Sequence, residues 1–136
     1  MIKEDGYVHL RHNKTLLLVH VIFVTKYRKE LEAKGIWEAI KQHIYDACSD
    51  NYIHIVTMES DKDHIHMLLR YEPTQSVSGI VSKLKQISTY RIWKQYPKYL
   101  KTLYWKEHTL WSDGYFAASV GNASKETIEN YIKNQG

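Results

Sequence analysis

Two small groups of residues carry side chains that could act together on a phosphodiester. The first is His64-Ile65-His66. On a β-strand, residues two apart point to the same face, so both imidazoles would lie together. The second is Tyr131 with Gln135, and on an α-helix this four-residue spacing places the phenol and the amide on one face. Two imidazoles and an amide oxygen can bind a divalent cation and a phenol can act as a nucleophile, so the combination suits metal-dependent cleavage by a tyrosine.

Neither group is specific when it is considered alone. The chain has 8 histidines and 11 tyrosines, so a single His-x-His pair is nearly expected by chance. A tyrosine near the end of a helix usually packs its ring and keeps its hydroxyl in water. From the residues alone, two surface histidines and one packed tyrosine are therefore the alternative interpretation.

Length and composition restrict the class of protein. The 136 residues fit one domain, which we expect to span residues 1–136, and the net charge of +4 favours an anionic partner. The single cysteine, Cys48, excludes an internal disulfide framework and a zinc site with several thiolates. There is no signal-peptide pattern, and the apolar run at 16–24 is too short to span a membrane. We therefore expect a soluble, cytoplasmic protein with no membrane partner.

Hydrophobic periodicity predicts alternating strands and helices. Period-two and β-branched segments predict strands at 16–25, 52–59, 64–71 and 115–120. Three- and four-residue apolar steps predict helices at 33–48 and 76–94, and Ser124 is a plausible N-cap for a last helix. Tyr96-Pro97 is expected to end the second helix, and residues 98–114 are expected to be irregular.

The order of these elements defines the expected fold class. The order β-α-β-β-α-β followed by a helix predicts an α+β protein of the split β-α-β type, with one antiparallel sheet and helices on one face. In the third strand, His64, His66 and Leu68 share one face, and Ile65, Met67 and Leu69 share the other.

A basic and aromatic stretch follows the histidine strand. Residues 73–106 contain no aspartate or glutamate, while seven lysines or arginines alternate with six tyrosines or tryptophans. Cations along a backbone beside rings that stack on bases are what a single-stranded nucleic-acid groove requires. The alternative is a solvated helix face followed by an aromatic core.

A second basic cluster lies at the end of the first predicted strand. The predicted DNA-binding residues from both places are Lys26, Arg28, Lys83, Lys85 and Arg91.

Five stretches, in order, resemble the single-tyrosine HUH transposases of small prokaryotic insertion sequences, which move DNA as single strands. Their order and spacing fit the family over nearly all of the chain beyond residue 15. They are His20-Val21-Ile22-Phe23-Val24-Thr25-Lys26-Tyr27-Arg28, Asp63-His64-Ile65-His66-Met67-Leu68, Leu110-Trp111-Ser112-Asp113-Gly114-Tyr115-Phe116, Ser119-Val120-Gly121 and Tyr131-Ile132-Lys133-Asn134-Gln135.

The resemblance implies a role for each residue of the two groups. The family's histidine-hydrophobe-histidine motif falls on His64 and His66 as metal ligands, its nucleophile on Tyr131, and its third ligand on Gln135. It also implies a ferredoxin-like fold, related to the RNA-recognition fold, and Mg²⁺ or Mn²⁺ as cofactor. One departure is Asp61-Lys62-Asp63, where the family often has Pro-Asp before the first histidine.

The implied reaction is the cutting and rejoining of single-stranded DNA near hairpins at the ends of an element. The tyrosine forms a 5′-phosphotyrosine linkage and leaves a free 3′-hydroxyl, which later attacks that linkage. The resemblance further implies a homodimer whose active sites are shared between subunits, acting in the prokaryotic cytoplasm at the nucleoid. Two alternatives are a non-catalytic nucleic-acid-binding domain of RNA-recognition type, and a domesticated relative that processes repeated chromosomal hairpins.

Overall fold

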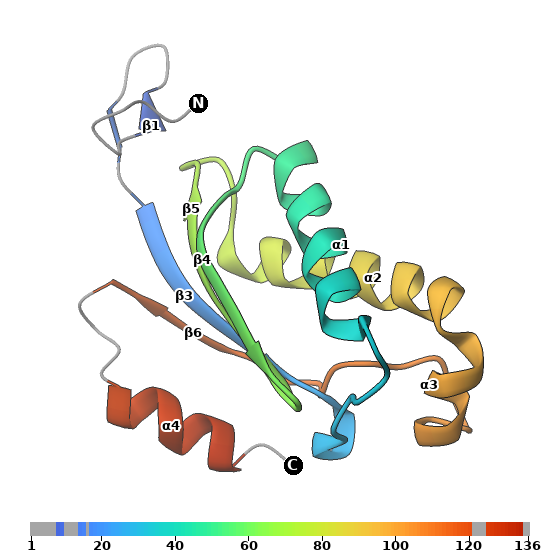
Figure 1. Ribbon diagram of the computed structural model, residues 1–136. Helices are drawn as coiled ribbons and strands as arrows, with labels where there is room; N and C mark the ends of the chain where they lie inside the picture. Colours follow the sequence, from blue (N-terminus) through green and yellow to red (C-terminus); the bar gives the residue numbers. More distant parts are fainter. Residues whose placement is uncertain (1–7, 10–13, 16, 121–124, 135–136) are drawn as a thin grey trace.

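The computed structural model describes residues 8–9, 14–15, 17–120 and 125–134, and its centre is a four-stranded sheet (Figure 1). The strands lie in the order β4-β5-β3-β6, and all neighbouring pairs are antiparallel. This is the strand order of a ferredoxin-like fold, so the predicted α+β class is confirmed. The strands are β3 (Leu17–Val24), β4 (His54–Asp61), β5 (His64–Tyr71) and β6 (Phe116–Ser119). A separate two-stranded pair, β1 (Val8–His9) with β2 (Lys14–Thr15), was not predicted.

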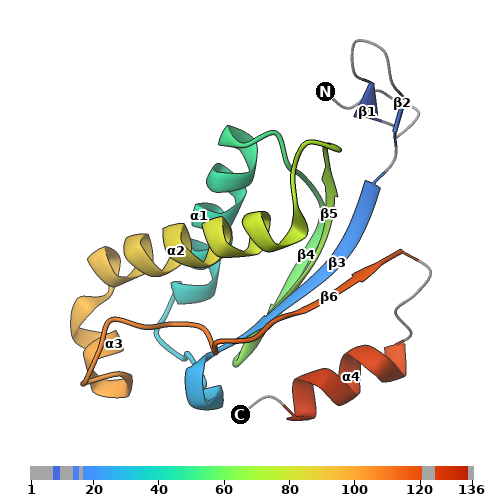
Figure 2. The ribbon, with the colours of Figure 1, turned by 180° about the vertical axis from the view of Figure 1, so that it is seen from behind.

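Helices cover both faces of this sheet. The two long helices, α1 (Ile36–Asp50) and α2 (Val77–Gln95), lie on one face, and α4 (Lys125–Asn134) lies on the opposite side (Figures 1 and 2). The core between the long helices and the sheet is formed by alternate residues of β3 and β5 and by the apolar stripes of the helices. Among the described helices, none is long and apolar enough to cross a membrane.

The sequence prediction for residues 98–114 was wrong. Residues 98–114 were expected to be irregular, but Pro97–Leu103 forms a helix, α3. Proline lacks an amide hydrogen and has a fixed φ, and both properties suit the first position of a helix, so Pro97 ends α2 and also begins α3.

Ser76 caps α2, with its Oγ accepting from the Gly79 amide at 3.0 Å. The predicted N-cap Ser124 lies outside the described residues.

The alternation predicted for the histidine strand is confirmed. Ile65, Met67 and Leu69 are fully buried under α1 and α2, while His64 and His66 point to the other face and are half-buried. We call this second face, which α4 partly covers, the histidine face. Its β3 side is closed, because Ile22 and Val24 there are fully buried without belonging to the core under α1 and α2.

The β4 side of the histidine face is open to solvent. The β4 residues that lie opposite His64 and His66 in the antiparallel register are Asp61 and Glu59, and both are exposed. The two histidines therefore lie at the boundary between the part of the sheet that α4 covers and the part that another molecule can approach.

Candidate active site

His64 is held by the turn that precedes it. Its Nδ1 lies 2.9 Å from Oδ1 of Asp63, and the two side chains are 20% and 18% exposed. Burial raises the pKa of Asp63, but hydrogen bonds from His64 and Arg28 outweigh burial and bring that pKa below its usual value. A carboxylate on one ring nitrogen fixes the imidazole and leaves Nε2 for a ligand, as is usual for metal-binding histidines.

His66 is held by a histidine that the sequence analysis did not include in the site. Its Nε2 lies 3.0 Å from Nδ1 of His20, which comes from β3, and the ring centroids are 5.2 Å apart. Burial and then the neighbouring His20 lower the pKa of His66, which favours the neutral imidazole, the form that binds metal. Sequence alone offered no reason to place His20 in the site, because its contact with His66, 46 positions away, depends on strand register.

Tyr131 lies on the same face of the sheet as the two histidines. Its ring packs on Phe116 with centroids 5.3 Å apart. Phe116 lies opposite Ile22 in the sheet register, and Ile22 lies opposite His66, so Phe116 and His66 share the face and are about 10 Å apart, two strand spacings. The phenol therefore lies in the layer that contains the histidine side chains.

The hydroxyl of Tyr131 is buried and has no hydrogen-bond partner within the part of the chain that the structure describes. Burial also raises the pKa of this phenol above its ordinary value. A buried hydroxyl without a partner costs about 1–3 kcal/mol, so its retention calls for an explanation. A role in chemistry with a bound molecule is such an explanation.

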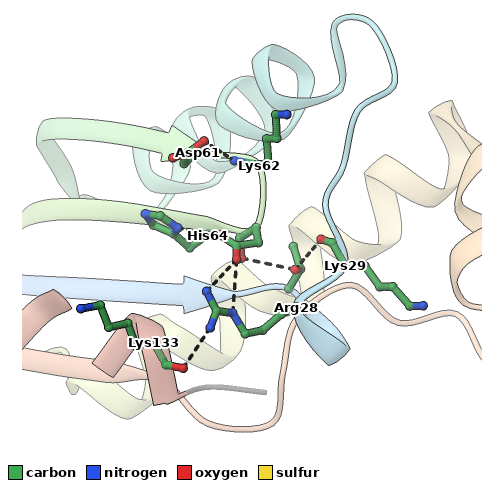
Figure 3. Close-up of polar contacts among 8 residues, drawn as sticks. Arg28, Lys29, Asp61, Lys62, His64 and Lys133 are labelled. Atoms are coloured by element: carbon green, nitrogen blue, oxygen red, sulfur yellow. Dashed lines mark hydrogen bonds and ion pairs between the residues drawn. The ribbon is translucent and has the colours of Figure 1, made fainter. Parts of the chain in front are cut away.

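Arg28 connects the last turn of α4 with Asp63, the carboxylate that contacts His64 (Figure 3). Its Nε and one terminal nitrogen donate to Oδ2 of Asp63, at 3.2 and 3.0 Å. Its other terminal nitrogen donates to the carbonyl oxygen of Lys133 at 2.9 Å. Lys133 follows Tyr131 by two residues, so one guanidinium contacts both the helix of the phenol and the carboxylate behind His64.

The two histidines are too few protein ligands for a structural zinc ion. Among the described residues there is no group of three or more His, Cys, Asp or Glu side chains that could hold a metal. His64 and His66 would thus be two protein ligands, and Gln135, the predicted third, lies outside the described residues. Mg²⁺ and Mn²⁺ commonly complete their coordination with water and phosphate oxygens, whereas structural zinc requires four protein ligands.

Two predicted DNA-binding lysines hold one loop of the protein. Lys85 is half-buried, which lowers its pKa, and its Nζ donates to the carbonyls of Ser112, Asp113 and Gly114 at 2.8–3.3 Å. Lys26 pairs with the Asp113 carboxylate at 3.0 Å. These contacts fix residues 112–114 and supply a structural role for both lysines.

The other predicted DNA-binding cations are placed differently. Lys83 is exposed and donates to Oδ1 of Asn51 at 2.9 Å, and Arg91 is half-buried on α2. Arg28 is engaged by Asp63 and the Lys133 carbonyl. Contact of any of these residues with DNA stays a prediction.

Five of the six aromatic residues of the basic stretch divide into two groups. Hydroxyls of Tyr96, Tyr99 and Tyr104 bond to backbone groups within residues 26–34, so these rings anchor that segment. In contrast, Tyr90 and Trp105 are 62% and 70% exposed. Lys94 lies 4.5 Å from the Tyr90 ring centroid and Lys106 lies 4.9 Å from the Trp105 ring centroid. These two exposed pairs of ring and cation remain suitable for stacking on nucleotides.

The fold and site define a ferredoxin-like protein in which a buried phenol and a histidine pair share one face of the sheet. The family model for IS200-like transposases matches residues 13–135. The chain therefore belongs to the IS200-like transposase family, whose members cut DNA and transfer its strands.

Individual relatives agree with this assignment. The chain is 31% identical to the ISDra2 transposase TnpA of Deinococcus radiodurans over 135 residues, covering 99% of this chain and 91% of that protein. It is also 31% identical to the transposase for insertion sequence element IS200 of Salmonella typhimurium, covering 93% and 81%.

Solved structures give the same fold. The crystal structure of a protein from Deinococcus radiodurans R1, described as a transposase, has a TM-score of 0.81 at 30% identity and covers 99% of this chain and 98% of that one. A REP-associated tyrosine transposase bound to a REP hairpin has a TM-score of 0.54 at 10% identity, with 94% and 68% coverage. At that identity the second likeness concerns the fold alone.

Proposed function

We propose that this transposase cuts and rejoins single-stranded DNA with Tyr131 as nucleophile and a divalent cation held by His64 and His66. The observation that supports it best is the buried Tyr131 hydroxyl, which has no partner among the described residues and lies on the histidine face. The structural link from the Tyr131 helix to His64 through Arg28 agrees with a common site.

The proposed cleavage step exchanges one phosphodiester bond for another. The Tyr131 oxygen bonds to phosphorus and loses its proton to solvent, and the bond from phosphorus to the 3′-oxygen breaks. The 3′-oxygen takes up a proton and leaves as a hydroxyl, so the 5′-phosphate stays on the tyrosine. Rejoining is the reverse attack by a 3′-hydroxyl. Since the phosphotyrosine conserves the energy of the broken bond, no ATP is required.

The phenol of Tyr131 is a weak nucleophile at neutral pH, because burial raises its pKa above the ordinary value near 10. The reaction therefore requires other groups that stabilise the charge on the phosphate. Mg²⁺ or Mn²⁺ at His64, His66 and Gln135 would stabilise negative charge on the phosphate and on the leaving oxygen. Because these three ligands are neutral, the cation keeps its full charge for the phosphate. Asp63 holds the His64 ring in place for that role.

We propose hairpin DNA at the ends of an insertion sequence as substrate, reached in the cytoplasm at the nucleoid. The exposed Tyr90 and Trp105 rings, with Lys94 and Lys106, support binding to unpaired bases and the backbone. The relatives at 31% identity act for insertion sequences, which favours a mobile element over a domesticated hairpin-processing role.

We further propose a homodimer. In the structure α4 packs on the sheet of its own chain, through the contacts of Tyr131 with Phe116 and of Lys133 with Arg28. A mixture of a Tyr131→Phe protein with a His64→Ala, His66→Ala protein tests whether sites are shared. Recovered cleavage would mean that the tyrosine of one subunit serves the histidines of the other, and no recovery would mean that each chain completes its own site.

The function is tested by incubating the protein with single-stranded hairpin oligonucleotides and Mn²⁺. A covalent protein–DNA adduct with a released 3′-hydroxyl fragment is the expected result. Tight binding without any adduct or cleavage across the panel would instead favour a non-catalytic binding domain.

A further inference from the structure

Arg28 uses all three of its nitrogens on two partners that belong to different parts of the site. Two nitrogens donate to Oδ2 of Asp63, whose other oxygen contacts His64. The third donates to the Lys133 carbonyl in the last turn of α4, where carbonyl oxygens lack partners within the helix. The Arg28 and Asp63 side chains are only 33% and 18% exposed, so water weakens this pairing less than at an open surface.

The backbone at Arg28 is strained in the conformation that makes these contacts. Tyr27 and Arg28 have φ values of 58° and 52°, in the left-handed region that non-glycine residues rarely adopt. The surrounding chain enforces this turn, since the Arg28 amide donates to the Thr25 carbonyl at 2.9 Å and Thr25 Oγ1 donates to the Lys29 carbonyl at 2.7 Å. Strain held in place by neighbouring contacts is typical of functional sites.

We infer that Arg28 is a positioning residue that fastens the last turn of α4 to the Asp63–His64 pair, so that one guanidinium sets both the nucleophile helix and a metal ligand. The positive guanidinium also lies at the helix C-terminus, where the helix dipole favours a cation. The effect of Arg28 on catalysis rests on the proposed function, whereas its attachment of α4 to Asp63 does not. The role differs from the DNA contact predicted from sequence, in which Arg28 would act through its charge.

Two substitutions separate these roles. Arg28→Ala removes the contacts and the charge, while Arg28→Lys keeps the charge but cannot form the fork to Asp63 and Lys133 together. Lys62→Ala is the matched control, because Lys62 is a neighbouring cation whose side chain forms an exposed ion pair with Glu32 at 3.3 Å. Circular dichroism of each variant verifies that the sheet and long helices are retained.

The first measurement is amide hydrogen exchange of residues 125–134 in the full chain without DNA. We expect exchange in α4 to accelerate about tenfold in both Arg28 variants, the size of effect that loss of one charge-assisted hydrogen bond gives, and to stay at the wild-type level in Lys62→Ala. Unchanged α4 exchange in both Arg28 variants would overturn the inference, and it would do so even if the wild-type protein proved unable to cut DNA.

The second measurement is calorimetric titration with Mn²⁺, followed by cleavage of a hairpin oligonucleotide. We expect both Arg28 variants to bind Mn²⁺ several-fold more weakly and to cut about tenfold or more slowly, with hairpin affinity nearly unchanged. If Arg28→Lys restores the rate fully and only Arg28→Ala loses hairpin affinity, Arg28 acts as a phosphate contact and the inference is wrong. Absence of cleavage in the wild type would reject the proposed function instead.

Discussion

His20 on β3 and His66 on β5 are diagonal neighbours on one face of the sheet, with Nδ1 of His20 3.0 Å from Nε2 of His66. A contact between two imidazoles fixes the ring planes and tautomers of both. We expect His20→Ala to weaken Mn²⁺ binding about tenfold and to slow cleavage similarly, because the His66 ring loses a group that orients it. His20→Asn should recover part of both, and Mn²⁺ affinity at the wild-type level in His20→Ala would contradict this role.

The histidine pair itself should be needed for chemistry and not for DNA binding. Changing His64 and His66 together to Ala is expected to abolish cleavage and Mn²⁺ binding while hairpin affinity stays within about threefold, since binding is proposed to rest on other groups. His54→Ala is the matched control, because His54 is exposed on β4 outside the pair. Normal cleavage by the double variant would show that the metal assignment is wrong.

DNA affinity should depend on the exposed pair of Tyr90 and Lys94. Tyr90→Ala is expected to cost about 1–3 kcal/mol in binding to a single-stranded hairpin. Lys94→Ala is expected to reduce the slope of log affinity against log salt concentration by about one, the effect of losing one phosphate contact. Tyr45→Ala is the control, because Tyr45 is also exposed, at 55%, but lies on α1. Fluorescence anisotropy at several salt concentrations measures both effects. Equal binding of blunt duplex and hairpin would count against the proposed specificity.

The elements of the fold that the sequence predicted correctly are those that depend on local patterns of apolar and polar residues. Alternation in residues 64–71 gave the strand and the face of both histidines because a buried core fixes the period of two. The Arg28 contacts were not predicted, because they join residues 35 and 105 positions apart and require two left-handed residues that no local propensity favours. His20 was missed for a similar reason, since only strand pairing brings it to His66, 46 positions away.

Cys48 gives a pH prediction outside the site. Its thiol is 1% exposed, and burial raises its pKa from 9.0 to about 12. A raised pKa in the folded state means that this contribution to stability is complete below pH 9 and is lost as the pH rises toward 12, because the unfolded chain ionises first. The free energy of unfolding, measured with urea, should therefore fall more steeply over this range for the wild type than for Cys48→Ala. Parallel curves would show that Cys48 ionises normally.

Tyr131→Phe separates packing from chemistry in the nucleophile helix. The Phe ring keeps the contact with Phe116, and a buried hydroxyl without a described partner is removed, so the free energy of unfolding should be higher by about 1–3 kcal/mol. Thermal unfolding of the two proteins measures this difference. A loss of more than about 2 kcal/mol would mean that the hydroxyl has a structural partner.

The central claim is that Tyr131 becomes covalently attached to DNA, and peptide mass spectrometry of the hairpin adduct tests it most directly. With Mn²⁺ and a labelled hairpin substrate, the wild-type protein should yield one modified peptide that carries a 5′-phosphate on Tyr131, and Tyr131→Phe should yield no adduct while binding the hairpin normally. An adduct that persists in Tyr131→Phe, or one that maps to another of the 11 tyrosines, would contradict the account.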